Sequence, residues 1–263
     1  MKISTKDFLK GCPDPHGMKK LIQQSEDVLK TWDPKWSNFV SAPLREYAIK
    51  TMSKLIDFEW DSDGGYSGAE RRRMICYRKG AHGTAERKNP APNLGLLIEG
   101  NFLFDRATKG EFLEGLNQFD IEPDGIGDLW ITGDRGAQAI CCSETAIMLH
   151  EANGKIGEVN IRLKSIEIAK LQIPTKRSPR IFETVEASTR IDAIASAGFG
   201  VSRAKIGKRI EEGYLRLNWS VINRRDRELC VGDKMHLENR GALEVLDIKE
   251  TKRQRWKIKL LRK

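Results

Sequence analysis

The sequence predicts an α+β protein made of three modules, and three observations support this prediction. Residues 1–88 hold apolar stripes at helical spacing and are predicted to be mainly helical. Residues 89–172 alternate short apolar runs with helical patterns in the order β-α-β-β-α-β. Residues 188–263 combine two short helical patterns with strands and carry most of the net positive charge. Residues 173–187, which contain two prolines, are predicted to link this small α+β module to the rest.

The helical prediction for the first module rests on two apolar stripes. Leu21 and Val28 belong to the first stripe, and Leu44 and Met52 belong to the second. A turn-rich stretch follows, and after it comes a short basic element, Arg71-Arg72-Arg73. We expect these arginines either to contact phosphate or to form a solvated helix edge.

The middle module is predicted from its order of elements. A G-D-R-G sequence at residues 133–136 lies between two apolar runs and indicates a hairpin. Ser143 is a suitable N-cap for a helix that continues to Asn153. The alternation of apolar and polar residues over 159–168 predicts a strand with one solvent-exposed face. This order is that of the ferredoxin-like fold.

Positive charge is confined to the last part of the chain. Residues 180–263 contain 20 Lys and Arg against 12 Asp and Glu, whereas the whole chain contains 46 against 37. The segment therefore carries +8 of the chain's net charge of +9. A basic module on an otherwise neutral chain indicates a surface for a polyanion, most often nucleic acid.

The second helical pattern of this module carries the candidate site. Ser202 is a suitable N-cap, and Lys205 and Arg209 are four residues apart, so they project from one helix face. Such like-charge neighbours repel one another, and a phosphate backbone lying against them would reverse that penalty. The free amides at the helix N-terminus also attract phosphate. The predicted RNA-binding residues are Arg190, Ser202, Arg203, Lys205, Lys208, Arg209, Arg216 and Asn218.

The C-terminal module resembles a known RNA-binding domain. Residues 189–219 read T-R-I-D-A-I-A-S-A-G-F-G-V-S-R-A-K-I-G-K-R-I-E-E-G-Y-L-R-L-N-W, and residues 231–237 read V-G-D-K-M-H-L. In order, these residues resemble the S-four domain, named after small-subunit ribosomal protein four. The shared features are the S-R pair that opens the second helix, the strand that leads to Asn and the later G-D turn.

The rest of the chain resembles the YlmH-like family, including its cyanobacterial and plastid branch of photosystem II S-four domain proteins. Gly64-Gly65-Tyr66 with Ala69-Glu70-Arg71 is similar to a G-G-Y-x-x-A-E-R stretch, and Ile126-Gly127-Asp128-Leu129 is similar to an I-G-D-I stretch. The family's F-L-G-x-L stretch is matched at residues 112–116, with Glu114 where Gly is common.

The resemblance implies an RRM-like middle domain, a C-terminal S-four domain and RNA binding on the ribosome or tRNA. The expected protein is non-catalytic and grips structured RNA, either ribosomal RNA or tRNA, by shape and phosphate. The expected partner is the large ribosomal subunit. Arg203→Glu combined with Arg209→Glu is expected to remove most of the affinity and to leave the fold intact.

Two alternatives remain open from sequence. One is a photosystem II assembly or repair factor whose basic face meets an acidic protein or thylakoid surface. The other is an RNA-modifying enzyme with an unrecognised site. Arg190-Ile191-Asp192 is similar to the catalytic R-L-D of pseudouridine synthases, but Asp192 falls in the first turn of a predicted helix, where it favours the helix dipole.

Other classes of function find little support in the sequence. No cofactor, metal or small-molecule substrate is expected, because the cysteines and histidines are dispersed and no C-x-x-C pair occurs. The acidic residues Asp120, Glu122, Asp124 and Asp128 are expected to form a solvated loop. Aromatic stacking of RNA on the middle sheet is not the default expectation, because its strand 137–142 has no aromatic residue. No membrane span is expected, and the predicted location is the cytoplasm, or the plastid stroma after loss of a transit peptide.

Overall fold

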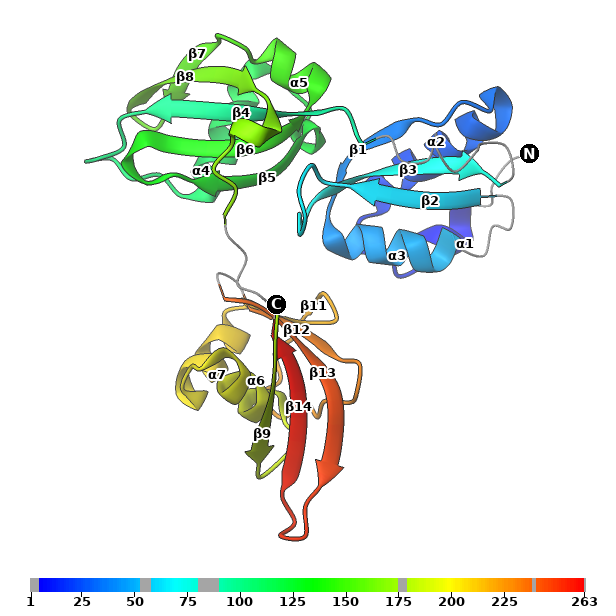
Figure 1. The fold of residues 1–263 in the computed structure, drawn as a ribbon, viewed down its shortest axis with the longest axis vertical. Helices are drawn as coiled ribbons and strands as arrows, with labels where there is room; N and C mark the ends of the chain where they lie inside the picture. Colours follow the sequence, from blue (N-terminus) through cyan, green and yellow to red (C-terminus); the bar gives the residue numbers. More distant parts are fainter. Residues whose placement is uncertain (1–4, 53–57, 80–89, 175–178, 238–239, 263) are drawn as a thin grey trace. The chain divides into compact units, whose positions relative to one another are not determined.

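The computed structural model describes residues 5–52, 58–79, 90–174, 179–237 and 240–262. The chain forms two compact units, Met1–Pro174 and Thr175–Lys263. The described parts contain helices and antiparallel sheets in both units, so the α+β prediction is confirmed (Figure 1). The boundary predicted at residue 88 lies outside the described residues. No helix of the described ranges is long and apolar enough to cross a membrane.

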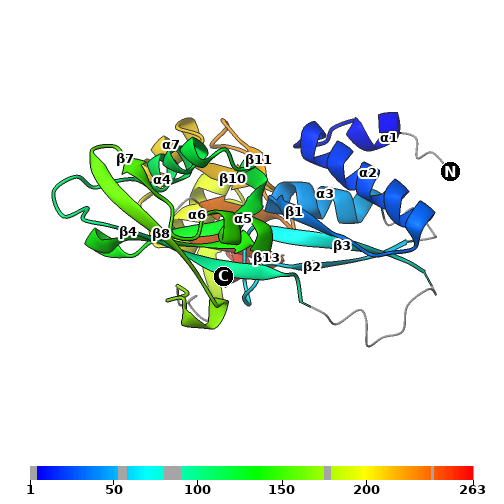
Figure 2. The same ribbon diagram turned by 90° about the horizontal axis from the view of Figure 1, so that it is seen from above.

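The first part of unit 1 is a three-stranded sheet, ordered β1-β3-β2, with helices packed on it (Figure 2). Its elements are α1 (Thr5–Leu9), α2 (Pro15–Thr31), β1 (Trp36–Val40), α3 (Ala42–Met52), β2 (Phe58–Asp63) and β3 (Arg72–Arg78). The three helices agree with the predicted helical region, but the sheet on which they pack was not predicted. The central strand β3 is buried from Arg73 to Tyr77, so it shows no apolar alternation, and such a run cannot be told from a helix by periodicity alone.

The second part of unit 1 has the predicted ferredoxin-like order. Its elements are β4 (Asn93–Gly100), α4 (Lys109–Leu116), η2 (Asn117–Phe119), η3 (Pro123–Gly125), β5 (Ile126–Ile131), η4 (Gly133–Arg135), β6 (Gly136–Cys142), α5 (Ser143–Met148), β7 (Asn153–Ile156), β8 (Val159–Ile166) and η5 (Ile168–Lys170). The antiparallel sheet is ordered β5-β6-β4-β8-β7. The helix predicted to reach Asn153 ends at Met148, and its last predicted residues turn into β7, which pairs with β8.

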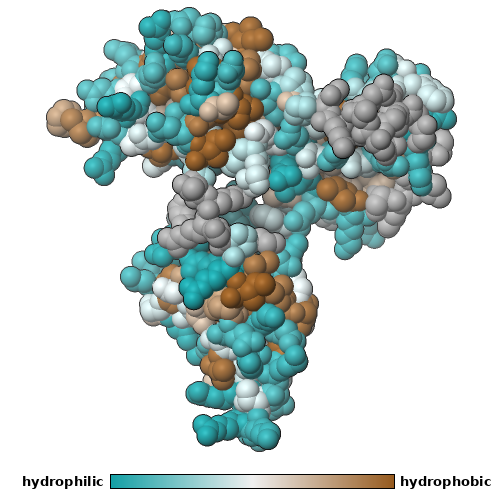
Figure 3. All heavy atoms as spheres, in the orientation of Figure 1, coloured by the Kyte–Doolittle hydropathy of each residue, from teal (hydrophilic) through white to brown (hydrophobic). Residues whose placement is uncertain are grey.

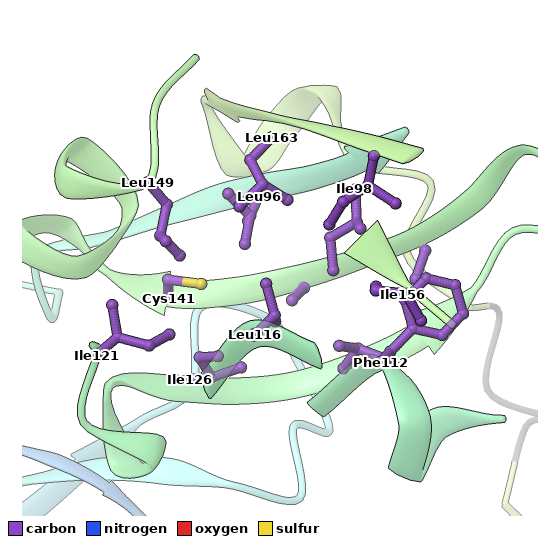
Figure 4. Packing of buried hydrophobic residues seen from close by; sticks show 14 of the residues in the cluster. Leu96, Ile98, Phe112, Leu116, Ile121, Ile126, Cys141, Leu149, Ile156 and Leu163 are labelled. Atoms are coloured by element: carbon purple, nitrogen blue, oxygen red, sulfur yellow. The ribbon is translucent and has the colours of Figure 1, made fainter. Parts of the chain in front are cut away.

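Helices α4 and α5 cover one face of this sheet. Phe112 and Leu116 of α4 pack with Leu96, Cys141 and Leu163 from the strands, all of them buried (Figure 4). The predicted apolar spacing of α4 is thus confirmed. Thr108 begins the helix through a capping box with Glu111, in which each side chain binds the other residue's backbone amide.

The opposite face of the same sheet is also covered. Ile140 of β6 is fully buried there and packs in a cluster with Leu171 and with Phe39 of β1. Trp130 of β5 joins this cluster, and its ring meets Tyr66 edge-on with centroids 6.2 Å apart. This is the face on which an RRM stacks RNA bases. Here it is packed against the chain itself, in agreement with the expectation that base stacking is not its role.

The stretches at residues 64–71 and 126–129 that resemble family motifs meet at this junction. The buried carboxylate of Asp128 accepts hydrogen bonds from the Tyr66 hydroxyl at 2.7 Å and from the backbone amides of Glu70 and Arg71 at 2.8 and 3.0 Å. Burial, followed by the hydrogen bond to Asp128, raises the pKa of Tyr66. The phenol therefore remains a hydrogen-bond donor at neutral pH.

Two glycines allow the close approach at this junction. A Cβ on Gly127 would lie 2.6 Å from the ring of Phe39. Gly65 has a φ of +84°, and a Cβ there would lie 3.0 Å from Ile168. Both positions need glycine, one for space and one also for its backbone conformation.

The acidic cluster is a docking surface between the two parts of unit 1 rather than a solvated loop. Lys20 of α2 pairs with Glu122 at 3.1 Å and with Asp124 at 2.8 Å, and Asn38 of β1 donates to both carboxylates. Asp128 is buried at the junction. The expectation of a solvated loop was therefore wrong for these three acids, because each has partners that lie 57 or more residues away in the sequence.

The arginine triplet also has a structural role. Arg73 is 5% exposed and donates to the backbone oxygens of Ser37 and Pro92. The backbone amide of Arg71 binds Asp128, and the Arg72 guanidinium binds the backbone oxygen of Ala69. Neither predicted role describes these residues, because they lie at the start of a strand and the guanidinium group of each binds a backbone oxygen.

Unit 2 is a six-stranded antiparallel sheet with α6 and α7 on one face (Figure 1). Its elements are β9 (Arg180–Glu186), α6 (Ile191–Phe199), α7 (Arg203–Glu211), β10 (Leu215–Leu217), β11 (Ser220–Val221), β12 (Lys234–Leu237), β13 (Gly241–Glu250) and β14 (Trp256–Arg262). The sheet is ordered β11-β10-β12-β13-β14-β9. On the face of this unit seen in Figure 3, hydrophilic residues predominate and the hydrophobic ones form small patches.

Strand β9 corrects the predicted linker 173–187. It pairs along its whole length with β14, from Arg180 opposite Arg262 to Glu186 opposite Trp256. The sequence around it contains prolines and basic residues that resemble a linker. The strand is recognisable only from its partner, which follows it by about 75 residues.

Candidate nucleic-acid interface

Helix α7 presents its positive charge because its opposite face is buried. Ile206 and Ile210 are fully buried against the sheet, and they fix which residues face outward. The Ser202 hydroxyl accepts a hydrogen bond from the Lys205 amide at 3.5 Å and so caps the helix as predicted. This bond engages the hydroxyl in the cap, so Ser202 positions the helix.

A hollow of about 520 Å³ lies beside α7. Three of the predicted cations, Lys205, Lys208 and Arg209, line it together with Arg240 from the segment before β13. The remaining lining residues are Val201, Glu212, Tyr214 and Leu237. We call these four cations with Tyr214 the cationic hollow.

The charge of the cationic hollow is only partly neutralised. Lys208 lies 3.8 Å from Glu212, one turn along the helix, and both side chains are exposed to solvent. The Arg209 guanidinium carbon lies 4.8 Å from the centre of the Tyr214 ring, a cation–π contact that leaves the charge in place. Lys205 forms no ion pair with any residue in the described part of the chain. The hollow therefore retains a net positive charge that suits an anion.

Two of the predicted RNA-binding arginines are instead held by an internal carboxylate. Asp192, which is 8% exposed, binds Arg190 at 3.1 and 3.2 Å and Arg203 at 3.1 and 3.2 Å. Burial disfavours the ionised carboxyl, but the hydrogen bonds from Arg203 and then Arg190 outweigh it and lower the pKa of Asp192. This network joins the starts of α6 and α7.

Because of this network, Arg203→Glu combined with Arg209→Glu no longer tests RNA binding alone. Arg203→Glu would place a second carboxylate beside buried Asp192 and remove one of its partners. The expectation that the substitution leaves the fold intact is therefore withdrawn, because a buried charge that loses its partner is strongly destabilising. Lys205 is the better choice, since it is exposed and lines the hollow.

Arg216 and Asn218 lie apart from the cationic hollow. Leu215 and Leu217 of β10 point into the core, so Arg216 between them faces outward on the side of the sheet opposite the helices. Asn218 donates to the Asp233 carboxylate at 2.8 Å and accepts from the Lys234 amide at 2.9 Å. Both polar atoms of its amide are thus engaged in holding the turn, where the sequence had indicated a base or backbone contact.

Comparisons with known proteins bear on unit 1. Residues 14–81 match the family model described as YlmH, N-terminal. The YlmH resemblance of this region is thereby supported. The match includes the G-G-Y stretch and the whole N-terminal side of the Asp128 junction.

Two proteins are similar over longer stretches. The "Ribosome-associated protein quality control protein P2" of Bacillus subtilis (strain 168) is 22% identical over 220 residues, which cover 82% of each chain. A solved structure, the "Cell division protein ylmH from Streptococcus pneumoniae", is 20% identical with a TM-score of 0.45 and covers 65% of this chain and 95% of that one.

The residues that match the YlmH model and the predicted RNA-binding residues lie in different units of the chain. The matched region contributes the surface that closes the middle sheet, whereas the predicted RNA-binding residues all lie in unit 2, outside the match. Among those predicted residues, the structure brings Lys205, Lys208 and Arg209 into one hollow. Arg240 and Tyr214 complete it and were missed: Arg240 reaches α7 only through the folding of the sheet, whereas Tyr214 follows α7 directly and its amide binds the Arg209 oxygen.

No metal site was identified in the searched part of the chain. Within the described ranges, no three His, Cys, Asp or Glu side chains gather closely enough to hold a metal ion. The free cysteines Cys76, Cys141 and Cys142 are buried, and burial raises the pKa of each thiol. These thiols are thus packing residues rather than nucleophiles.

Proposed function

We propose that this chain is a non-catalytic RNA-binding protein of the YlmH-like family that works on the ribosome. Its C-terminal unit would act as an S-four domain and grip structured RNA, either ribosomal RNA or tRNA. The observation that carries the proposal is the cationic hollow, where three cations of one short helix and Arg240 surround one depression.

The hollow suits RNA phosphate for electrostatic reasons. Like charges gathered on one helix repel one another unless an anion lies between them. Arg209 adds a planar guanidinium that can bind two phosphate oxygens at once, and Tyr214 holds it by a cation–π contact. Glu212 is the one acid in the lining, and it faces Lys208. Such a surface recognises a folded backbone by shape and charge and carries little base sequence information.

The ribosome is the proposed partner because of the Bacillus subtilis relative, whose name describes it as ribosome-associated. The match covers 82% of this chain, which is more than unit 1 alone, so it extends into unit 2. The proposed location is accordingly the cytoplasm. A role in photosystem II assembly through protein contacts finds no specific support in the geometry, since the lining of the hollow fits phosphate as described.

Cosedimentation with purified ribosomal subunits tests the proposal. We expect the protein to migrate with the large subunit on a sucrose gradient and to be released by mild ribonuclease treatment. Lys205→Glu combined with Arg209→Glu is expected to leave the protein at the top of the gradient. If the protein stays bound after the RNA is digested, the contact is to protein and the proposal is wrong.

A matched control separates the hollow from net charge. Lys252→Glu with Arg253→Glu makes the same change in charge at the β13–β14 turn, which lies away from α7 in unit 2 (Figure 1). This variant is expected to cosediment almost like the unaltered protein. Equal loss in both variants would indicate attraction by net charge alone and would contradict a site at α7.

A further inference from the structure

The turn between β10 and β11 carries an aromatic residue in a position that favours glycine. Leu217 pairs with Ser220, so Asn218 and Trp219 form a two-residue hairpin loop. Their φ angles are +48° and +70°. Positive φ at both positions is the signature of a type I′ turn, for which Asn-Gly is the preferred sequence.

Asn218 fits this turn, but Trp219 does not. The αL backbone is tolerated by asparagine and disfavoured for a bulky side chain. The Asn218 hydrogen bonds to Asp233 and Lys234 hold the turn in place, and the next residue adopts the left-handed region. A tryptophan kept in a strained position indicates a role for its side chain that glycine would not provide.

The Trp219 ring packs on His236, the residue that is paired with Arg216 across the sheet. It packs on the His236 ring with centroids 5.6 Å apart and an interplanar angle of 31°. Arg216 is directly opposite His236 across the β10–β12 pair, so these side chains are neighbours on one face. Arg216 is exposed and forms no ion pair with another described residue. Trp219 itself is partly exposed.

We propose that Trp219 stacks against an unpaired nucleobase of the bound RNA, with Arg216 on the adjoining phosphate. An aromatic platform beside a cation is the arrangement that binds single-stranded nucleotides, because every base offers a π face and every nucleotide a negative charge. This site rests on the proposed RNA-binding function. It extends that function from the helix side of unit 2 to the opposite face of its sheet and from a folded backbone to an unpaired base.

Trp219→Gly is the decisive substitution, because it removes the ring and supplies the residue that the turn favours. The variant is expected to fold at least as stably as the unaltered chain, so weakened binding cannot be ascribed to unfolding. The probe is a short hairpin RNA with an unpaired loop, titrated with the full chain at constant salt. Loss of one stacking contact is expected to weaken binding by about 5- to 150-fold.

A second probe isolates the base from the backbone. It is the same hairpin with abasic residues in the loop, which keeps the phosphates and removes the stacking partner. On this probe the unaltered chain and Trp219→Gly are expected to bind equally, whereas Arg216→Gln is expected to weaken binding to both probes. Trp219→Phe retains an aromatic face and should restore part of the affinity for the first probe.

The outcomes distinguish this inference from the proposed function. Lys205→Glu with Arg209→Glu should weaken binding to both probes if the cationic hollow grips RNA. If that variant weakens binding and Trp219→Gly does not, the stacking site is overturned and the hollow stands. If Trp219→Gly weakens binding equally for the two hairpins, the ring does not recognise a base. If the unaltered chain binds neither hairpin, the stacking site is likewise overturned.

Discussion

Replacement of Asp128 by alanine should loosen the junction between the two parts of unit 1. The carboxylate accepts three hydrogen bonds, from the Tyr66 hydroxyl and from the amides of Glu70 and Arg71. A hydrogen bond to a charged group contributes about 1.5–3 kcal/mol, and a buried donor left without an acceptor costs about 1–3 kcal/mol. Because the three bonds share one acceptor, their contributions do not add, and we expect a loss of about 3–5 kcal/mol.

Two measurements check this magnitude. Denaturant unfolding of the full chain should show the transition of unit 1 at a lower midpoint in Asp128→Ala, and hydrogen exchange should show faster exchange of the Glu70 and Arg71 amides. Tyr66→Phe removes one of the three bonds and should lower the free energy of unfolding by about 1.5 kcal/mol. Glu158→Ala, at an exposed turn, is the control and should change it by less than about 0.5 kcal/mol.

The reasoning is refuted by a stable alanine variant. If Asp128→Ala unfolds within about 1 kcal/mol of the unaltered chain and the two amides keep their protection, the carboxylate does not hold the junction.

Three further predictions concern the hollow, the glycine contact and the arginine network. If RNA neutralises the four cations of the hollow, a plot of the logarithm of the binding constant against the logarithm of the salt concentration should have a slope of about −3 to −4. Lys205→Glu with Arg209→Glu should change this slope to about −1.5 and should lower the affinity about 40-fold at 0.1 M salt. Gly127→Ala should lower the stability of unit 1 by about 1–3 kcal/mol, because its Cβ would meet the Phe39 ring at 2.6 Å, whereas Gly110→Ala in α4, whose Cβ has room, should raise it slightly in thermal unfolding. Asp192 has a lowered pKa, so its stabilisation is fully present above the unfolded pKa of about 4 and is lost as pH falls through the lower folded value. Unfolding monitored from pH 8 to 2 should therefore show that the contribution of Asp192 to stability is constant above about pH 5 and declines below about pH 4. Asp192→Asn should be less stable at pH 7, and its stability should depend less on acid. An acid profile that the substitution leaves unchanged would contradict the network.

Local patterns were sufficient for the helices of unit 2 and for the ferredoxin-like order. Ser202 caps α7, Ile206 and Ile210 are buried, and Lys208 and Arg209 between them are exposed, as the helical period requires. These features depend on neighbours within about four residues, so they are readable from the chain. The prediction failed where a strand has both faces buried, as in β3, or a distant partner, as in β9.

The amino-acid sequence by itself determined where positive charge gathers and which helix displays it. Only the tertiary structure decided which of those charges are available: Asp192 binds Arg190 and Arg203, while Lys205 and Arg209 remain at the hollow and Arg240 joins them. The physical reason is that the two properties depend on residues at different separations along the chain. Helical periodicity is a local property, whereas the neutralisation of a charge depends on every carboxylate that the folded chain brings within a few ångströms.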